Sequence, residues 1–255
     1  SKIDVPIAQH AEDIILTNGG CINEGSVSRK LGVKGISNAT EAIIVERDIL
    51  LNQITGGHYH VLHVSTKESM EAIRRAKANG QHVTCEVSPH HFTLTDEAVL
   101  EHGTNAKMNP PLRSESDRLA LIEGLKDGTV DAIATDHAPH EIQSKEVSIS
   151  KAAFGIVGLE TMLPLSLELY HNGALSLREV MRRLTCGPAD IINEPAGRLK
   201  KGVRADLTLI DLDHEWTIEC NSFQSKSKNS PFDGRKVKGR AIKTFVNGFS
   251  VYEMH

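Results

Sequence analysis

The 255-residue sequence is poor in aromatic residues, which make up 4% of it and include a single Trp. No run approaches the ~18 consecutive apolar residues of a membrane helix, and the opening SKIDVPIAQH lacks the organisation of a signal peptide. Lys and Arg number 29 against 33 Asp and Glu, a net charge of −4, without a basic cluster. These absences argue against membrane insertion, export and nucleic-acid binding, and they predict a cytoplasmic protein.

Cysteine is also scarce, and no C-x-x-C pair occurs among Cys21, Cys85, Cys186 and Cys220. Reduced, mostly buried thiols are therefore expected. No G-x-G-x-x-G follows a strand-like run, which argues against a dinucleotide-binding sheet. The residue in excess is histidine, with thirteen copies, and this abundance directs attention to metal ligation.

The sequence alternates two kinds of pattern. Short apolar runs predict strands at residues 3–8, 58–64, 82–87, 106–109 and 131–135. Amphipathic stretches predict helices over residues 41–54, 67–78, 118–125 and 180–184, capped by Thr40, Thr66, Ser114 and Ser176. This alternation predicts an α/β fold in which parallel strands are joined by right-handed crossovers.

Polar clusters follow the predicted strands, where a (β/α)8 barrel places its chemistry. Only four or five strand–helix units can be counted against the eight of a closed barrel, and the chain opens on Ser1 rather than Met. We therefore expect residues 1–202 to form the C-terminal part of a (β/α)8 TIM-like barrel. Residues 203–255 are expected to form a small β appendage, in which Asn247-Gly248 turns a hairpin and residues 224–229 are a polar loop.

Asp136 follows the apolar run at 131–135 and is succeeded by two histidines, with Pro139 between them. Because proline stops the strand, Asp136 is placed at its end, where a carboxylate suits metal ligation or proton transfer. An Asp that caps the next helix, with surface histidines, is the alternative.

The predicted strand at 58–64 contains three histidines. Strand alternation puts His58 and His60 on one face and His63 on the other, together with Tyr59 and Val61. We choose His63, at the C-terminal end, as the metal ligand and assign His58 and His60 structural or outer roles. His10 ends its own strand, and by itself it is more often a structural histidine.

Asn109 precedes two prolines, which fix the backbone and hold its amide in one orientation. An amide both donates and accepts hydrogen bonds, which suits a cyclic imide or a carboxylate-bearing substrate. A proline-braced loop is the alternative. Arg113 is expected to pair with Glu115 or Asp117.

These segments together resemble the amidohydrolase superfamily, and closely the bacterial dihydroorotases. The matching motifs occur in the family's order, at HAED (10–13), HVST (63–66), VSPHH (87–91), KMNPPLR (107–113), ATDHAPH (134–140), FGIVG (154–158) and ADLTLI (205–210). Several of these motifs also occur in hydantoinases and allantoinases. KMNPPLR favours the dihydroorotases, because those relatives usually lack its Asn.

The resemblance implies a two-zinc enzyme that interconverts carbamoyl-aspartate and dihydroorotate in pyrimidine biosynthesis. It implies His10 and His63 as ligands of one zinc ion, and Asp136 as a ligand of the other and the general acid/base. Asn109 and His140 become substrate contacts, and Phe154 and Gly155 offer backbone groups to the ring. Residues 141–153 would be mobile. A homodimer and an aspartate transcarbamoylase partner are further expectations.

The family also has a His-x-His-x-Arg segment, a substrate Asn and a bridging carboxylate or modified Lys, which this sequence lacks. Both zinc ions would then have fewer than their usual four donors. We therefore expect these 255 residues alone to bind zinc weakly and to have little activity. Two other functions stay open: another cyclic amidohydrolase, such as a hydantoinase or allantoinase, or a non-catalytic dihydroorotase-like subunit.

Overall fold

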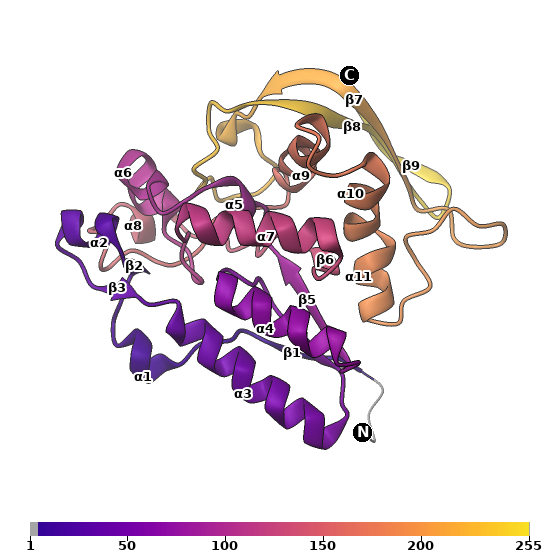
Figure 1. Cartoon of the computed structure of the whole chain (residues 1–255). Helices are drawn as coiled ribbons and strands as arrows, with labels where there is room; N and C mark the ends of the chain where they lie inside the picture. Colours follow the sequence, from indigo (N-terminus) through magenta and orange to yellow (C-terminus); the bar gives the residue numbers. More distant parts are fainter. Residues whose placement is uncertain (1–4, 255) are drawn as a thin grey trace.

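The computed structural model describes residues 5–254, and residues 3–4 of the first predicted strand lie outside them. Its centre is a parallel sheet in the order β1-β4-β5-β6. The strands are β1 (Ile7–Gln9), β4 (Tyr59–Val61), β5 (Val83–Val87) and β6 (Ala132–Ile133). Neighbouring strands of this sheet are parallel and follow one another in chain order, as the strands in the wall of a (β/α)8 barrel do (Figure 1). The α/β expectation is confirmed.

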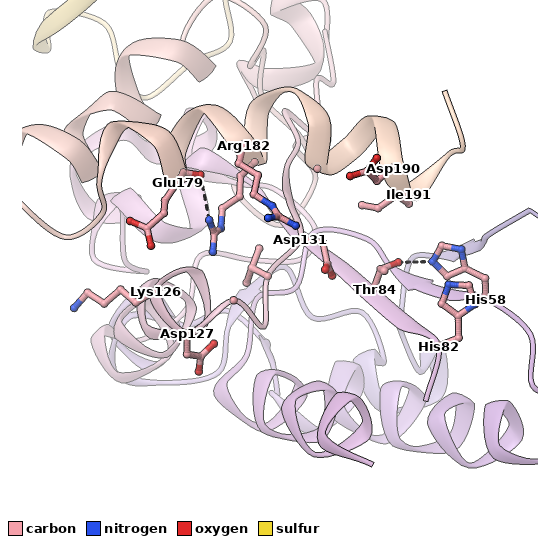
Figure 2. A pocket seen from close by; sticks show the side chains of 14 residues that line it. His58, His82, Thr84, Lys126, Asp127, Asp131, Glu179, Arg182, Asp190 and Ile191 are labelled. Carbon is pink, nitrogen blue, oxygen red and sulfur yellow. Dashed lines mark hydrogen bonds between the residues drawn. The ribbon is translucent and has the colours of Figure 1, made fainter. Parts of the chain in front are cut away.

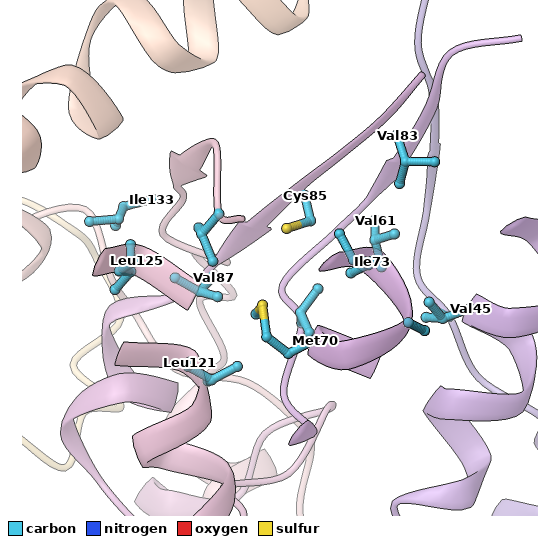
Figure 3. Close-up of a cluster of buried hydrophobic side chains, with 14 of the residues drawn as sticks. Val45, Val61, Met70, Ile73, Val83, Cys85, Val87, Leu121, Leu125 and Ile133 are labelled. Atoms are coloured by element: carbon cyan, nitrogen blue, oxygen red, sulfur yellow. The ribbon is translucent and has the colours of Figure 1, made fainter. Parts of the chain in front are cut away.

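Three helices cover one face of this sheet: α3 (Ala39–Thr55), α4 (Lys67–Ala78) and α7 (Glu115–Asp127). Val83, Cys85 and Val87 alternate along β5 and are buried beneath them, packed with Met70 and Ile73 (Figure 3). Each fully buried side chain of this kind contributes roughly 1.5–3 kcal/mol. The opposite face of β5 carries Thr84 and Glu86, and the polar chemistry of the sheet therefore lies on that side.

Most of the predicted caps are confirmed. The side chains of Thr66, Ser114 and Ser176 accept from backbone N–H groups at the starts of α4, α7 and α10 (Leu177–Leu184). Thr40 is an exception, since α3 begins at Ala39 and the Thr40 hydroxyl donates to the Ser37 carbonyl instead.

The predicted strand at 106–109 is wrong. Residues Gly103–Ala106 form a 3-10 turn, η1, and Lys107 and Asn109 follow it in irregular backbone. Pro110 and Pro111 have no N–H to donate to a ladder, and the Lys107 carbonyl accepts from Gly155 rather than from a strand. The segment is apolar because Ala106 and Met108 enter a second core.

An antiparallel sheet, β7 (Leu207–Thr217), β8 (Lys236–Val246) and β9 (Phe249–Glu253), completes the fold. The Asn247-Gly248 hairpin is confirmed, and both residues have positive φ. β7 has an irregularity between Asp211 and Glu215. β8 packs on α9 (Met162–His171), where Gly239 lies against Leu167. A domain division at residue 202 remains a prediction.

Short elements make up the rest. They are α1 (Ile14–Thr17), β2 (Ile22–Asn23), α2 (Ser26–Leu31), β3 (Gly35–Ile36), α5 (Pro89–Thr93), α6 (Ala98–His102), α8 (Ile142–Lys145), α11 (Cys186–Ile191) and the 3-10 turn η2 (Cys220–Ser222). The four cysteines are free thiols, as expected. Within residues 5–254, no helix is both long enough and apolar enough to cross a membrane.

Candidate active site

Two of the predicted ligands meet at the carboxyl ends of adjacent strands. His10 follows β1, and its Nδ1 lies 3.0 Å from Nε2 of His63, which follows β4. The two rings are edge to face, with centroids 4.8 Å apart. His63 is buried, and its Nδ1 has no hydrogen-bond partner. His10 Nδ1 and His63 Nε2 therefore face each other, and His63 Nδ1 lies on the other side of its ring.

The backbone, rather than strand alternation, brings His63 to this position. Tyr59 and Val61 pack against the helices, whereas His58 and His60 bond Thr84 on the opposite face of the sheet. The face on which His63 was predicted is therefore the helix-covered one, and that part of the reasoning was wrong. The strand ends at Val61, and His63 adopts a φ of 32°, a left-handed turn that releases it from the alternation.

Asp136 makes a similar turn after β6, with a φ of 47°. Burial raises the pKa of its carboxyl above the usual value, opposed by the imidazoles of His63 and His10. Burial in turn lowers the pKa of His63, which the Asp136 carboxylate partly offsets. The charges of Asp136 and the two histidines therefore influence one another, and the role of Asp136 stays a prediction.

Glu12, which appears in the sequence only within the HAED motif at 10–13, connects two of the predicted site residues. Its Oε2 accepts from His10 Nε2 and from Asn109 Nδ2, both at 3.0 Å, and its Oε1 accepts from the Thr17 hydroxyl at 2.6 Å. Despite burial, these hydrogen bonds keep the pKa of Glu12 below its usual value. One carboxylate therefore connects a predicted metal ligand to a predicted substrate contact.

Arg113 does not pair with Glu115 or Asp117 as predicted. It is buried, and it donates to the Ser65 hydroxyl, the Asn23 side chain and the Ile36 carbonyl. The carboxylate that most favours its charged form is Glu41, itself buried. Glu115 is exposed, and the buried Asp117 carboxylate accepts instead from Asn38 Nδ2 and the Lys67 N–H.

His140 and Gly155 lie on facing loops joined by Asn229. The Asn229 Oδ1 accepts from the His140 backbone, and its Nδ2 donates to the carbonyls of Ala138 and Gly155 at 3.1 Å. The His140 Nε2 donates to the Phe154 carbonyl at 2.7 Å. Asn229 is buried, so the loop at 224–229 is more than a polar loop, although no sequence signal marked it.

Two buried lysines hold the segment before Gly155. Lys107 Nζ donates to the carbonyls of Ile149 and Ala152, each at 2.7 Å. Lys145 Nζ donates to those of Ala153 and Gly155, and burial lowers its pKa to about 8. The expected mobility of residues 141–153 remains a prediction, and these contacts fix the segment in the arrangement described.

A pocket of about 430 Å³ lies at the other end of the strands. His58 and His82 precede β4 and β5 and stack there with centroids 4.0 Å apart, while Asp131 lines the same pocket (Figure 2). Lys77 bonds Asp131 at 2.5 Å. Because (β/α)8 enzymes place chemistry at the carboxyl ends, we assign this pocket no catalytic role.

The spacing of the two imidazoles suits a zinc ion. Two imidazole nitrogens on one tetrahedral zinc lie roughly 3.3 Å apart, and those of His10 and His63 are 3.0 Å apart. Their separation fits shared ligation by His10 Nδ1 and His63 Nε2. In the part of the chain described here, no cluster of three or more His, Cys, Asp or Glu side chains suited to a metal ion is found. The pair fits a metal ion, but the donor set is incomplete.

Comparison with known proteins identifies the lineage. The profile of the amidohydrolase family matches residues 45–251, and that of dihydro-orotase-like proteins matches residues 1–69. The chain belongs to the amidohydrolase family. Proteins of this family are generally metal-dependent.

Curated relatives include dihydroorotases from a Wolbachia of Drosophila simulans and from Anaplasma phagocytophilum, both 61% identical. The matches cover 99% and 98% of this chain but only 57% and 56% of the relatives. The chain thus spans little more than half the length of these proteins, as it does of the solved structures below.

An L-hydantoinase from Arthrobacter aurescens superposes with a TM-score of 0.87 at 31% identity, covering 97% of this chain and 57% of that one. A dihydropyrimidinase from Brevibacillus agri superposes with 0.88 at 21% identity, over 99% and 57%. The expected fold, part of an amidohydrolase TIM barrel with a C-terminal β-sheet, is confirmed.

Proposed function

We propose that this chain forms the carboxyl-side part of a dihydroorotase active site. The observation that carries the proposal is the 3.0 Å approach of His10 and His63 at the strand ends, with Asp136 in the same electrostatic environment. Curated dihydroorotases 48–61% identical over nearly the whole chain favour this activity over hydantoin hydrolysis, since the solved L-hydantoinase is 31% identical.

In this proposal His10 and His63 are ligands of one zinc ion, and Asp136 is a ligand of a second and the general acid/base. Zinc, when bound, supplies Lewis-acid activation of an amide carbonyl and of water. The Asp136 carboxyl holds the proton that moves to or from the ring nitrogen of dihydroorotate. Burial raises the pKa of this carboxyl above its usual value, which is the direction that favours holding a proton.

The remaining residues orient the substrate. Asn109 donates from a side chain already fixed by Glu12, and His140 lies beside the Phe154-Gly155 backbone. His140 also lines a pocket of about 540 Å³ with Asn229 and Lys145. Such groups contribute orientation rather than bond breaking.

We also propose the substrates, the location and the assembly of the protein. Small acids, carbamoyl-aspartate and dihydroorotate, are the substrates, the location is cytoplasmic, and the assembly is a homodimer that can associate with aspartate transcarbamoylase. Residues 1–202 and 203–255 act as the barrel part and the β appendage. We propose neither nucleic-acid nor membrane binding.

A chimera tests the activity. Residues 1–255 replace the matched segment of the Wolbachia dihydroorotase, so that the rest of that protein completes the site. We expect the chimera to hydrolyse dihydroorotate in preference to hydantoin and allantoin, and its Asp136→Asn variant to lose at least about 100-fold in kcat. A chimera that prefers hydantoin would support the sibling activity. A folded chimera that is inactive on all three substrates would support the alternative that the chain is a non-catalytic dihydroorotase-like subunit.

A further inference from the structure

Glu12 lies where three side chains from separate segments converge. It receives hydrogen bonds from His10 at the end of β1, from Thr17 in α1, and from Asn109 in the loop after η1. Its neighbour Asp13 does something else, since its carboxylate caps α1 by accepting from Ile15 and Leu16. Two adjacent carboxylates therefore have distinct partners, and only Glu12 contacts the candidate site.

The hydrogen bonds determine where the His10 proton resides. A carboxylate only accepts, so His10 Nε2 carries the hydrogen that it donates to Glu12. Nδ1 of a neutral His10 then has a lone pair, and it accepts from His63 Nε2 at 3.0 Å. The same lone pair is the one that a metal ion needs.

We propose that Glu12 is a positioning residue that fixes His10 as its Nε2–H tautomer and aims the Nδ1 lone pair at the point shared with His63. It also anchors the Asn109 amide, so that one carboxylate sets both the ligand and the substrate contact. The part concerning metal and substrate rests on the proposed function, whereas the tautomer assignment does not.

Thr17 provides the reason why Glu12 holds one orientation. Its hydroxyl donates to Oε1 at 2.6 Å and leaves Oε2 for both His10 and Asn109. Partners of this kind, which hydrogen-bond the far nitrogen of a metal-ligating histidine, commonly change metal affinity 10–100-fold when removed.

The experiment compares Glu12→Gln with Asp13→Asn in the 255-residue chain. The nitrogen chemical shifts of His10, assigned by their loss in His10→Asn, report its tautomer without metal. We expect a dominant Nε2–H form in the unmodified chain and in Asp13→Asn. Glu12→Gln should shift His10 toward a mixture of tautomers, because an amide can donate as well as accept. Thr17→Val should shift it less, in the same direction.

A second readout is the affinity for Co²⁺, titrated alone by absorption in the Wolbachia chimera. We expect Glu12→Gln to weaken it 10–100-fold at unchanged Tm, with Asp13→Asn unaffected. An Nε2–H tautomer that persists in Glu12→Gln, or an unchanged Co²⁺ affinity, would overturn the proposal. A chimera that turns out to hydrolyse hydantoin would refute the dihydroorotase assignment and leave the tautomer result standing.

Discussion

Glu41 and Arg113 lie on opposite sides of the Ser65 hydroxyl, and both are buried. Glu41 also accepts from the Ser65 and Thr66 backbone N–H groups, which follow the left-handed turn at His63. Arg113 ends the segment that begins at Asn109. This pair of charges therefore connects the turn carrying a candidate ligand to the loop carrying a candidate substrate contact.

Arg113→Ala should strongly destabilise the fold, because it leaves the Glu41 carboxylate buried without its main opposite charge. We expect a loss of about 3–5 kcal/mol in the free energy of unfolding, measured by urea denaturation. Lys126→Ala removes an exposed Lys paired with the exposed Glu123 and should cost less than about 1 kcal/mol. Equal losses in the two variants would show that the buried pair has no special role.

Acid should destabilise the protein through His91. Its Nε2 donates to the Pro110 carbonyl, its Nδ1 is buried without a partner, and burial lowers its pKa to about 4. Between pH 6.5 and 4 the unfolded chain binds this proton and the folded chain does not, so the free energy of unfolding falls as pH falls.

His91 alone accounts for a decrease of about 3 kcal/mol over that range. His91→Gln keeps a donor for Pro110 and should remove about that part of the pH dependence, measured by urea denaturation at pH 7 and pH 4. The neighbouring buried His90, whose pKa burial also lowers, keeps its own part. The exposed His171→Gln is the control and should leave the slope unchanged. If His91→Gln retains the full slope, another group is responsible.

Asn229→Asp should loosen the loop that carries Gly155. A carboxylate cannot donate to the carbonyls of Ala138 and Gly155, which would then face a negative charge. We expect a loss of about 2 kcal/mol or more in stability, and faster hydrogen exchange at the Gly155 amide.

Asn172→Asp is the matched control, since the Asn172 Oδ1 accepts from the Ala174 N–H in an exposed turn and a carboxylate can do the same. It should change stability by less than about 0.5 kcal/mol. Unaltered exchange at Gly155 in Asn229→Asp would mean that the two lysines hold the segment without Asn229.

Metal binding by these 255 residues alone should be weak and should depend on His63. We expect less than two zinc ions per chain by elemental analysis, and loss of the residual Co²⁺ absorption in His63→Asn. His102→Asn should have no effect. Two tightly held zinc ions with normal turnover of dihydroorotate would contradict this expectation.

The sequence predicted the elements whose signals are local. Capping by Thr66 and Ser176, the Asn247-Gly248 hairpin and the parallel strands all follow from short patterns, and the structure confirms them. The error at 106–109 arose because an apolar run does not distinguish a strand from irregular backbone that enters a core.

Tertiary relations were harder to predict. Arg113 has acidic neighbours in sequence, yet its charge partner is Glu41, brought close only by folding. Glu12 and Asn229 act through segments far along the chain, at Asn109 and Ala138. His63 was chosen as the histidine at the C-terminal end of its strand, and the alternation that separated it from His58 and His60 ends at Val61. Burial and backbone turns of this kind produce no periodic pattern in the sequence from which they could be predicted.

The left-handed backbone at His63 and Asp136 restricts which amino acids these positions can accept. Asparagine, aspartate and histidine tolerate that conformation, whereas valine, isoleucine and threonine are strained in it. Both bends begin after the strand ladder has ended, so a replacement there leaves the pairing of β4 and β6 intact. The side chains at the carboxyl ends of the strands can therefore change among only a few amino-acid types, while the strand pairing beneath them stays the same.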